Sequence, residues 1–335
     1  MTKTKTKTKT KTKTQKSAVL ASLVAFALAG SGGCANQAAS PVTPSAHAAM
    51  SAGSLGMSGS VGSASLAGSA IDQDLTARIV HMIDASEADV GVFAQSLDTR
   101  ETVEIGADES YPMLSTFKVY AVAAFLDRFG TSAALDDTVT IAEPDLVDNS
   151  PVTSENVGRP MSYRDLAIAA LTRSDNTAGN LLLRKIGGPA EIGEFAGRVG
   201  DSASRLDRWE VELNEATPGD ERDSTTARGL AAGYRAVLDG DVLTPEARDL
   251  LVGWMGETET SDKLSRAELP EGWTTADKSG GGYYGTRNTA GLVLGPEGQR
   301  ILLVVLSRDG KDRRDGPYAE QLISGIAAET TALGR

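Results

Sequence analysis

Apolar residues recur at helical spacing where the globular part of the chain begins. One helix face with 3.6 residues per turn would collect Leu75, Ile79, Met82 and Ile83. Two short strand-like runs follow at 90–94 and 101–105, separated by a turn-like segment at 98–100. The pattern therefore predicts a helix and then a pair of strands.

Helical spacing dominates the middle of the chain, at 115–127, 163–171, 178–186, 225–238 and 245–254. Strand-like runs return at 289–294 and 301–306, before a closing helix near 318–331. Strands at both ends with helices between them favour an α/β plus all-α fold. We expect a mixed domain of antiparallel sheet with helices, built from both termini, at about 71–112 and 257–335. A helical domain would be inserted at about 113–256.

Residues 1–34 are typical of an export signal. Seven Lys and no acid precede an apolar run at 18–29, and small residues fill 30–33. The run is shorter than the ~20 apolar residues that span a bilayer. Cys34 follows at once and resembles the lipidated Cys of bacterial lipoprotein signals, although Ser31 stands where a larger aliphatic residue is usual. We expect export, either as a secreted protein or as a lipoprotein anchored to the outer face of the membrane.

The next segment, at 35–70, differs in composition from the rest of the chain. Ala, Gly and Ser make up 23 of the 35 residues at 36–70, and none is charged. Such a composition buries too little apolar surface to offset the entropy of ordering. The sequence predicts a flexible tether here and a folded domain at 71–335.

Charge and composition exclude several classes of function. The chain has 33 basic and 45 acidic residues, a net charge of -12, which becomes -19 without residues 1–34. An acidic chain repels phosphate backbones, so nucleic acid is not an expected partner. Cys34 is the only Cys, which rules out an internal disulfide and a Cys-based zinc site. Only His47 and His81 are present, which argues against a His metal site and a Ser-His-Asp triad.

Three short motifs carry the candidate chemistry. Ser115 and Lys118 are one helical turn apart, and a desolvated lysine can activate a serine hydroxyl as a nucleophile. Many helices contain Ser and Lys at this spacing by chance. The second and third motifs are Ser174-Asp175-Asn176 and Lys278-Ser279-Gly280, and each alone is more typical of a surface turn.

Together and in this order, the motifs resemble the S-x-x-K, S-D-N and K-T-G signature of class A β-lactamases and penicillin-binding proteins, with Ser279 in place of Thr. A fourth stretch, RWEVELN at 208–214 continuing to Asp223, resembles the omega loop of class A β-lactamases. In that loop, Arg208 and Asp223 match the ion pair that closes it. The chain thus resembles a class A serine β-lactamase over essentially all of 71–335.

The resemblance implies a catalytic role for Ser115, Lys118, Ser174 and Glu210. Ser115 would attack the lactam carbonyl, with either Lys118 or, through a water molecule, Glu210 as the base. Ser174 would pass a proton to the departing ring nitrogen. Glu210 would then activate the water that hydrolyses the acyl-serine.

The resemblance also implies a substrate-binding role for Asn176, Asn214, Lys278, Ser279, Gly281 and Arg287. Asn176 would bind Lys118 and the substrate's side-chain amide, and Asn214 would help to hold the water. Lys278, Ser279 and Arg287 would hold the substrate carboxylate. Backbone N–H groups of Ser115 and Gly281 would form the oxyanion hole. The family uses no metal or organic cofactor, and we expect a monomer whose partner is a small-molecule β-lactam.

Two departures from the family concern substrate range. Asn149 stands where many members place an aromatic residue at the entrance of the site. Leu114 and Gly282 stand where some carbapenem-hydrolysing members have a disulfide. Residues 280–285 also satisfy G-x-G-x-x-G, but a strand-like run and not a helix follows, so we reject a dinucleotide site.

Two alternatives to a β-lactamase share part of this signature. A cell-wall D,D-peptidase has the first three motifs, but Glu210 and Asn214 in their loop argue against it. A penicillin-sensing domain, acylated without turnover, would normally accompany a membrane-spanning segment, and the sequence shows none. The predicted function is hydrolysis of penicillins, and of some cephalosporins, which gives antibiotic resistance; the ranking of substrates stays open.

Overall fold

The computed structural model describes residues 70–334 of the chain. The expected signal, Cys34 and the tether lie outside the described residues. Within 70–334, no helix is both long enough and apolar enough to cross a membrane.

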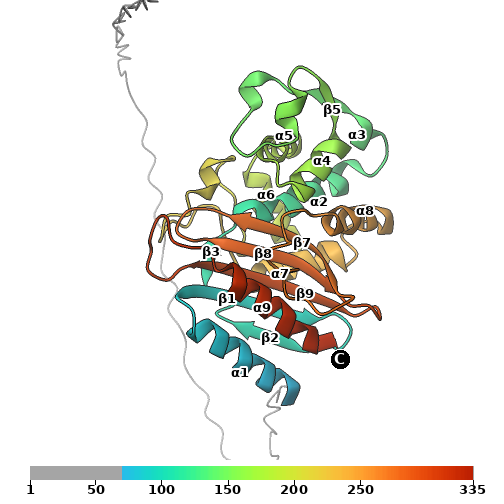
Figure 1. Cartoon of the computed structure of the whole chain (residues 1–335). Helices are drawn as coiled ribbons and strands as arrows, with labels where there is room; N and C mark the ends of the chain where they lie inside the picture. Colours follow the sequence, from blue (N-terminus) through green and yellow to red (C-terminus); the bar gives the residue numbers. More distant parts are fainter. Residues whose placement is uncertain (1–69, 335) are drawn as a thin grey trace, which may run out of the picture. The chain divides into compact units, whose positions relative to one another are not determined.

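A five-stranded antiparallel sheet forms the centre of the fold, in the order β2-β1-β9-β8-β7 (Figure 1). Its strands are β1 (Ala88–Ser96), β2 (Thr102–Ile105), β7 (Thr274–Gly281), β8 (Arg287–Leu294) and β9 (Arg300–Asp309). The early and late segments of the described chain meet where β1 pairs with β9, with Val92 opposite Val305. The predicted fold class, a mixed antiparallel sheet built from both termini, is confirmed.

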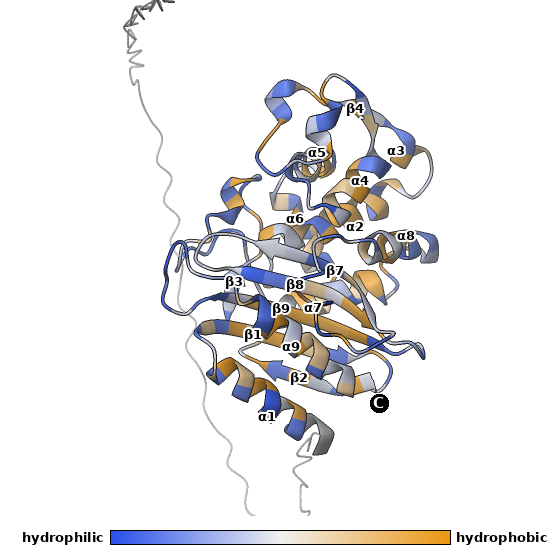
Figure 2. Cartoon of the chain, in the orientation of Figure 1, coloured by the Kyte–Doolittle hydropathy of each residue, from blue (hydrophilic) through white to orange (hydrophobic). Residues whose placement is uncertain are grey.

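Both faces of the sheet are covered, which explains why β9 is a continuous apolar run. Alternate residues of a strand point to opposite faces. Ile301, Leu303 and Val305 pack with α1 (Ala70–Asp84) and α9 (Glu320–Thr330). Their neighbours Leu302, Val304 and Leu306 join the core shared with the middle helices. Figure 2 shows the resulting apolar colour on β1 and β9.

The middle of the described chain is helical. It comprises α2 (Phe117–Phe129), α3 (Ala133–Asp136), α4 (Tyr163–Thr172), α5 (Asn176–Ile186), α6 (Ala190–Arg198), α7 (Ala227–Leu238) and α8 (Pro245–Gly256). Residues 117–126 of α2 are all buried, so this helix is the axis around which the others pack. The helix α7 is not separate from the sheet, because it lies against β9 and β1.

Three details differ from the sequence prediction. First, β7 was not among the predicted strands, because its sequence TTADKSGG is polar although its side chains are largely buried. Second, α6 was not predicted, nor were the two-stranded pairs β3 (Ser110–Pro112) with β6 (Ser224–Thr226) and β4 (Thr138–Thr140) with β5 (Pro160–Ser162). Third, α2 begins at Phe117 and not at residue 115, because Leu114–Thr116 forms a 3-10 turn.

Candidate active site

Ser115 lies in the 3-10 turn that leads into α2. The residue before it, Leu114, has a φ of 52°, in the left-handed region that a branched side chain rarely adopts. Such a conformation costs on the order of 1–3 kcal/mol and persists only where the surroundings fix it. The Tyr234 hydroxyl donates to the Thr116 carbonyl at 2.7 Å, which ties this turn to α7.

Lys118 is fully buried one turn further along α2. Its ammonium donates to Ser115 Oγ at 3.0 Å and to Asn176 Oδ1 at 2.7 Å. It also donates to the Ser174 carbonyl at 2.9 Å and lies 3.1 Å from Glu210 Oε1. Burial lowers the pKa of Lys118, and the negative charge of Glu210 acts against this shift. The lowered pKa brings the lysine closer to the neutral form that can accept a proton.

The Ser-Asp-Asn motif brings a second hydroxyl to the nucleophile. Asp175 is the N-cap of α5 and accepts the N–H groups of Ala178, Val152 and Thr153, which fixes the motif to a neighbouring loop. Ser174 has a φ of 54°, and its Oγ accepts from Lys278 at 3.0 Å. The same oxygen lies 3.4 Å from Lys118 Nζ, so it sits between two lysines.

The Lys-Ser-Gly motif lies on β7, alongside the nucleophile. A Cβ on Gly280 would lie 2.8 Å from Leu114 Cβ, so only a glycine allows the strand this close to the turn. Lys278 is fully buried and donates to Ser174 Oγ and, at 2.7 Å, to the Ser279 carbonyl. Burial and then the charge of Lys118 hold the pKa of Lys278 well below its ordinary value.

A buried carboxylate lies on β7 directly before this lysine. Asp277 Oδ2 accepts hydroxyl groups from Ser261, Ser265 and Thr289 at 2.7–2.9 Å, and Oδ1 accepts from Thr275 at 2.5 Å. Its negative charge opposes the lowering of the Lys278 pKa. The four hydroxyl groups supply the hydrogen bonds that the buried carboxylate needs, and none of them carries a charge.

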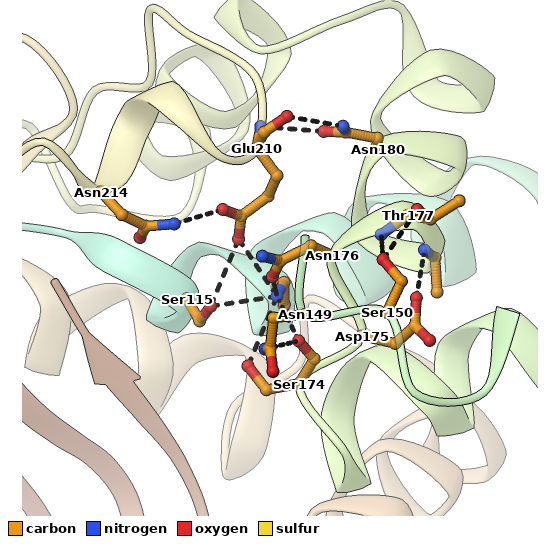
Figure 3. Close-up of polar contacts among 12 residues, drawn as sticks. Ser115, Asn149, Ser150, Ser174, Asp175, Asn176, Thr177, Asn180, Glu210 and Asn214 are labelled. Carbon is orange, nitrogen blue, oxygen red and sulfur yellow. Dashed lines mark hydrogen bonds and ion pairs between the residues drawn. The ribbon is translucent and has the colours of Figure 1, made fainter. Parts of the chain in front are cut away.

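Glu210 reaches Ser115 from the predicted loop, as Figure 3 shows. Ser115 Oγ donates to Glu210 Oε1 at 3.3 Å, and Asn214 Nδ2 donates to Glu210 Oε2 at 2.5 Å. The backbone of Glu210 is held by Asn180 on α5: the Asn180 amide donates to its carbonyl at 2.9 Å, and the Asn180 carbonyl accepts its N–H at 3.0 Å. The peptide bond between Glu210 and Val211 is cis.

The expected ion pair at the base of this loop is present. Arg208 Nε lies 2.5 Å from Asp223 Oδ2, and Asp223 is almost fully buried. The other oxygen of Asp223 accepts the backbone N–H groups of Asp207 and Arg208. These bonds join the two ends of the segment at 208–223.

A polar cavity of about 480 Å³ opens onto the nucleophile. It is lined by Ser115, Asn149, Arg173, Ser174, Asn176, Asn214, Thr260, Ser279, Gly280, Gly281, Arg287 and Tyr318. Lys118, Glu210 and Lys278 lie behind this lining and not on it. Burial lowers the pKa of Arg287, whose Nη2 lies 3.4 Å from Glu320 Oε1.

Two buried side-chain atoms in the described part of the chain have no hydrogen-bond partner, and both belong to this site. They are Asn214 Oδ1, an acceptor, and Arg287 Nε, a donor. A buried polar atom without a partner is costly, so the site keeps two polar groups that the rest of the protein does not satisfy. The structure thus brings together all ten site residues predicted from the sequence.

Sequence reasoning missed four residues that shape the site, namely Asn180, Thr260, Asp277 and Tyr318. Asn180 follows Asn176 by four residues on the same helix, a spacing that could have shown that both face the loop. Thr260 accepts the Ser279 hydroxyl at 2.7 Å, a contact that nothing local in the sequence reveals. Among residues 70–334, no cluster of His, Cys, Asp and Glu could hold a metal ion.

Comparison with known proteins gives a consistent result. A model of the beta-lactamase enzyme family matches residues 73–333. A beta-lactamase of Amycolatopsis lactamdurans is 39% identical over 266 residues, which are 79% of this chain and 86% of that protein. The solved beta-lactamase from Streptomyces albus G is 37% identical with a TM-score of 0.74, covering 77% of this chain and 98% of that one. A solved variant of the last common ancestor of Gram-negative class A beta-lactamases is 40% identical with a TM-score of 0.72, covering 77% and 97%.

Proposed function

This chain belongs to the beta-lactamase enzyme family as a class A serine hydrolase, and we propose that it opens penicillins, and some cephalosporins, through an ester formed on Ser115. Its reaction is hydrolysis of the β-lactam amide bond, which gives resistance to the antibiotic. The distances around Ser115 support the covalent route, because the hydroxyl has both a lysine and a carboxylate within reach.

In the acylation step, Ser115 Oγ adds to the lactam carbonyl and the ring C–N bond breaks. The serine proton passes to Lys118, 3.0 Å away, or to Glu210, 3.3 Å away. The Ser174 hydroxyl, which accepts from Lys278, delivers a proton to the departing nitrogen. Backbone N–H groups of Ser115 and Gly281 stabilise the oxyanion, a contribution of roughly 2.7–4 kcal/mol per donor.

Substrate binding depends on positive charge next to the nucleophile. Ser279 and Arg287 line the cavity. Lys278 lies behind this lining and donates to the Ser279 carbonyl. The Arg287 guanidinium lines the cavity and would donate to the substrate carboxylate. Asn176, whose Oδ1 already accepts from Lys118, offers its amide to the side chain of the substrate.

In the deacylation step, water adds to the ester carbonyl, the bond to Ser115 Oγ breaks, and the serine regains a proton. The observation that carries the hydrolytic function is the pair of Glu210 and Asn214. Their side chains are hydrogen-bonded, and Asn214 lines the same cavity as Ser115, which supports a role for the pair in activating the attacking water. Such a positioned base contributes typically about 10²–10⁴-fold. A D,D-peptidase does not need this pair.

The test replaces Glu210 with Gln, which keeps the size and polarity but cannot accept the proton. Mass spectrometry after mixing with benzylpenicillin should show one added substrate mass on Ser115 in Glu210→Gln, and little in the parent, which turns over. Hydrolysis by the variant at the parent's rate would refute Glu210 as the deacylating base.

We also propose that the protein is exported and acts outside the cytoplasm, anchored by a lipid on Cys34. The support is the sequence at 1–34 alone, since these residues lie outside the described part. Cys34→Ser should release the enzyme into the medium. Unchanged membrane association of this variant would contradict the lipoprotein proposal.

A further inference from the structure

Tyr318 is an aromatic residue of the cavity wall, and the mechanism does not use it. It lies just before α9, and 46% of its surface is exposed. Its hydroxyl donates to the Gly282 carbonyl at 3.3 Å, and the Arg287 guanidinium lies over its ring at 5.2 Å from the centroid. The ring therefore has a fixed place beside the arginine.

No other aromatic side chain lines this cavity. At Asn149, where an aromatic residue is common in the family, the wall is polar. Apart from the glycines, the remaining lining is built from hydroxyl, amide and guanidinium groups. Apolar contact with a flat group in a substrate is thus confined to the corner that Tyr318 occupies.

This corner is also where the substrate carboxylate is expected. A Cβ on Gly281 would lie 3.0 Å from an Arg287 nitrogen and 3.5 Å from the Tyr318 hydroxyl, so the end of β7, the arginine and the tyrosine converge. In a cephalosporin, the ring carbon that carries the carboxylate is bonded to a carbon with a variable substituent. A carboxylate bound at Arg287 places that substituent next to the exposed tyrosine ring.

We propose that Tyr318 is a specificity-determining residue that favours β-lactams with a flat aromatic group on the carbon adjacent to the carboxylate-bearing carbon. The inference rests on the proposed function, because it assumes that Arg287 binds the carboxylate. An aromatic pair of this kind changes an equilibrium by about 3- to 10-fold.

The experiment compares two cephalosporins that share a thienylacetyl side chain. One carries a dinitrostyryl group at the variable carbon and the other an acetoxymethyl group. The measured quantity is the ratio of their kcat/KM values, styryl over acetoxymethyl. Tyr318→Ala and Tyr318→Leu should lower this ratio by about 3- to 10-fold, and Tyr318→Phe, which keeps the ring, should leave it within about 2-fold.

Tyr283 provides the matched control. It is 45% exposed and its ring contacts the Arg314 guanidinium at 3.6 Å, but it does not line the cavity. Tyr283→Ala should leave the ratio unchanged, and a drop equal to that of Tyr318→Ala would overturn the proposal. An unchanged ratio in Tyr318→Ala, or an equal loss for both substrates, would also overturn it. A parent enzyme that hydrolyses neither compound would instead refute the proposed function.

Discussion

Asn180 holds Glu210 by both polar groups of its backbone. Its side-chain amide donates to the Glu210 carbonyl at 2.9 Å, and its side-chain carbonyl accepts the Glu210 N–H at 3.0 Å. Asn180 lies on α5, one turn beyond Asn176, which binds Lys118. One helix thus positions both the lysine and the carboxylate that face Ser115.

Asn180→Leu should disturb Glu210 without changing a group that touches substrate. Two buried backbone groups would lose their partners, each at a cost of about 1–3 kcal/mol of unfolding free energy. Because Glu210 would be less well placed, deacylation should slow more than acylation, which stopped-flow measurements with benzylpenicillin can separate. Asn156→Leu is the control, since the Asn156 amide donates to the Val152 carbonyl and not to Glu210. Equal slowing of both steps would contradict a positioning role.

The charge of Glu210 should set the pH at which Lys118 loses its proton. Glu210 raises the pKa of Lys118 against the effect of burial, so Glu210→Gln should lower that pKa further. If neutral Lys118 is the base of acylation, the rise of the acylation rate with pH should move to lower pH in Glu210→Gln. Glu210→Asp, which keeps the charge, should move it less. Complete loss of acylation in Glu210→Gln would instead identify Glu210 as the acylating base.

Lys278 should make the stability of the fold depend on pH in the alkaline range. Its pKa is far below the ordinary value in the native state, so the unfolded chain binds this proton more tightly. The native state should therefore gain stability as pH rises toward the unfolded pKa of about 10.5. Lys278→Met removes the effect, so the unfolding free energy of the variant minus that of the parent should fall with rising pH, by at most about 1.4 kcal/mol per unit. Urea unfolding between pH 7 and 9.5 measures this, and a difference that rises with pH would contradict it.

Arg287→Ala should weaken catalysis on penicillins. Loss of a charge-assisted hydrogen bond to the carboxylate is expected to cost about 1.5–3 kcal/mol, or roughly 10- to 150-fold in kcat/KM. The methyl ester of the same penicillin lacks that charge, so the difference between parent and variant should largely vanish with it. Kinetics of Arg287→Ala that match the parent on the free acid would show that Lys278 and Ser279 suffice.

Much of this fold follows from local pattern. Helical spacing located α1, α4, α5, α7 and α8 to within a few residues, and apolar runs located β1, β8 and β9. By contrast, β7 escaped the pattern, because its polar side chains are buried among hydrogen-bonding partners that lie far away in the sequence. Asp277 shows this: three of its four hydroxyl partners lie 12 to 16 residues away.

The candidate chemistry of the site was predicted from the sequence, since four motifs resemble those that supply a nucleophile, its bases and a carboxylate anchor in class A β-lactamases. The geometry was decided by the tertiary structure alone. Ser115 and Glu210 are 95 residues apart in the chain and 3.3 Å apart in space, a contact that packing and not spacing creates. The same holds for Asn180 and Tyr318, even though the four-residue spacing puts Asn180 on one helix face with Asn176, because a residue that positions or flanks another belongs to no motif. Its role exists only once α5 meets the loop, or the start of α9 meets β8.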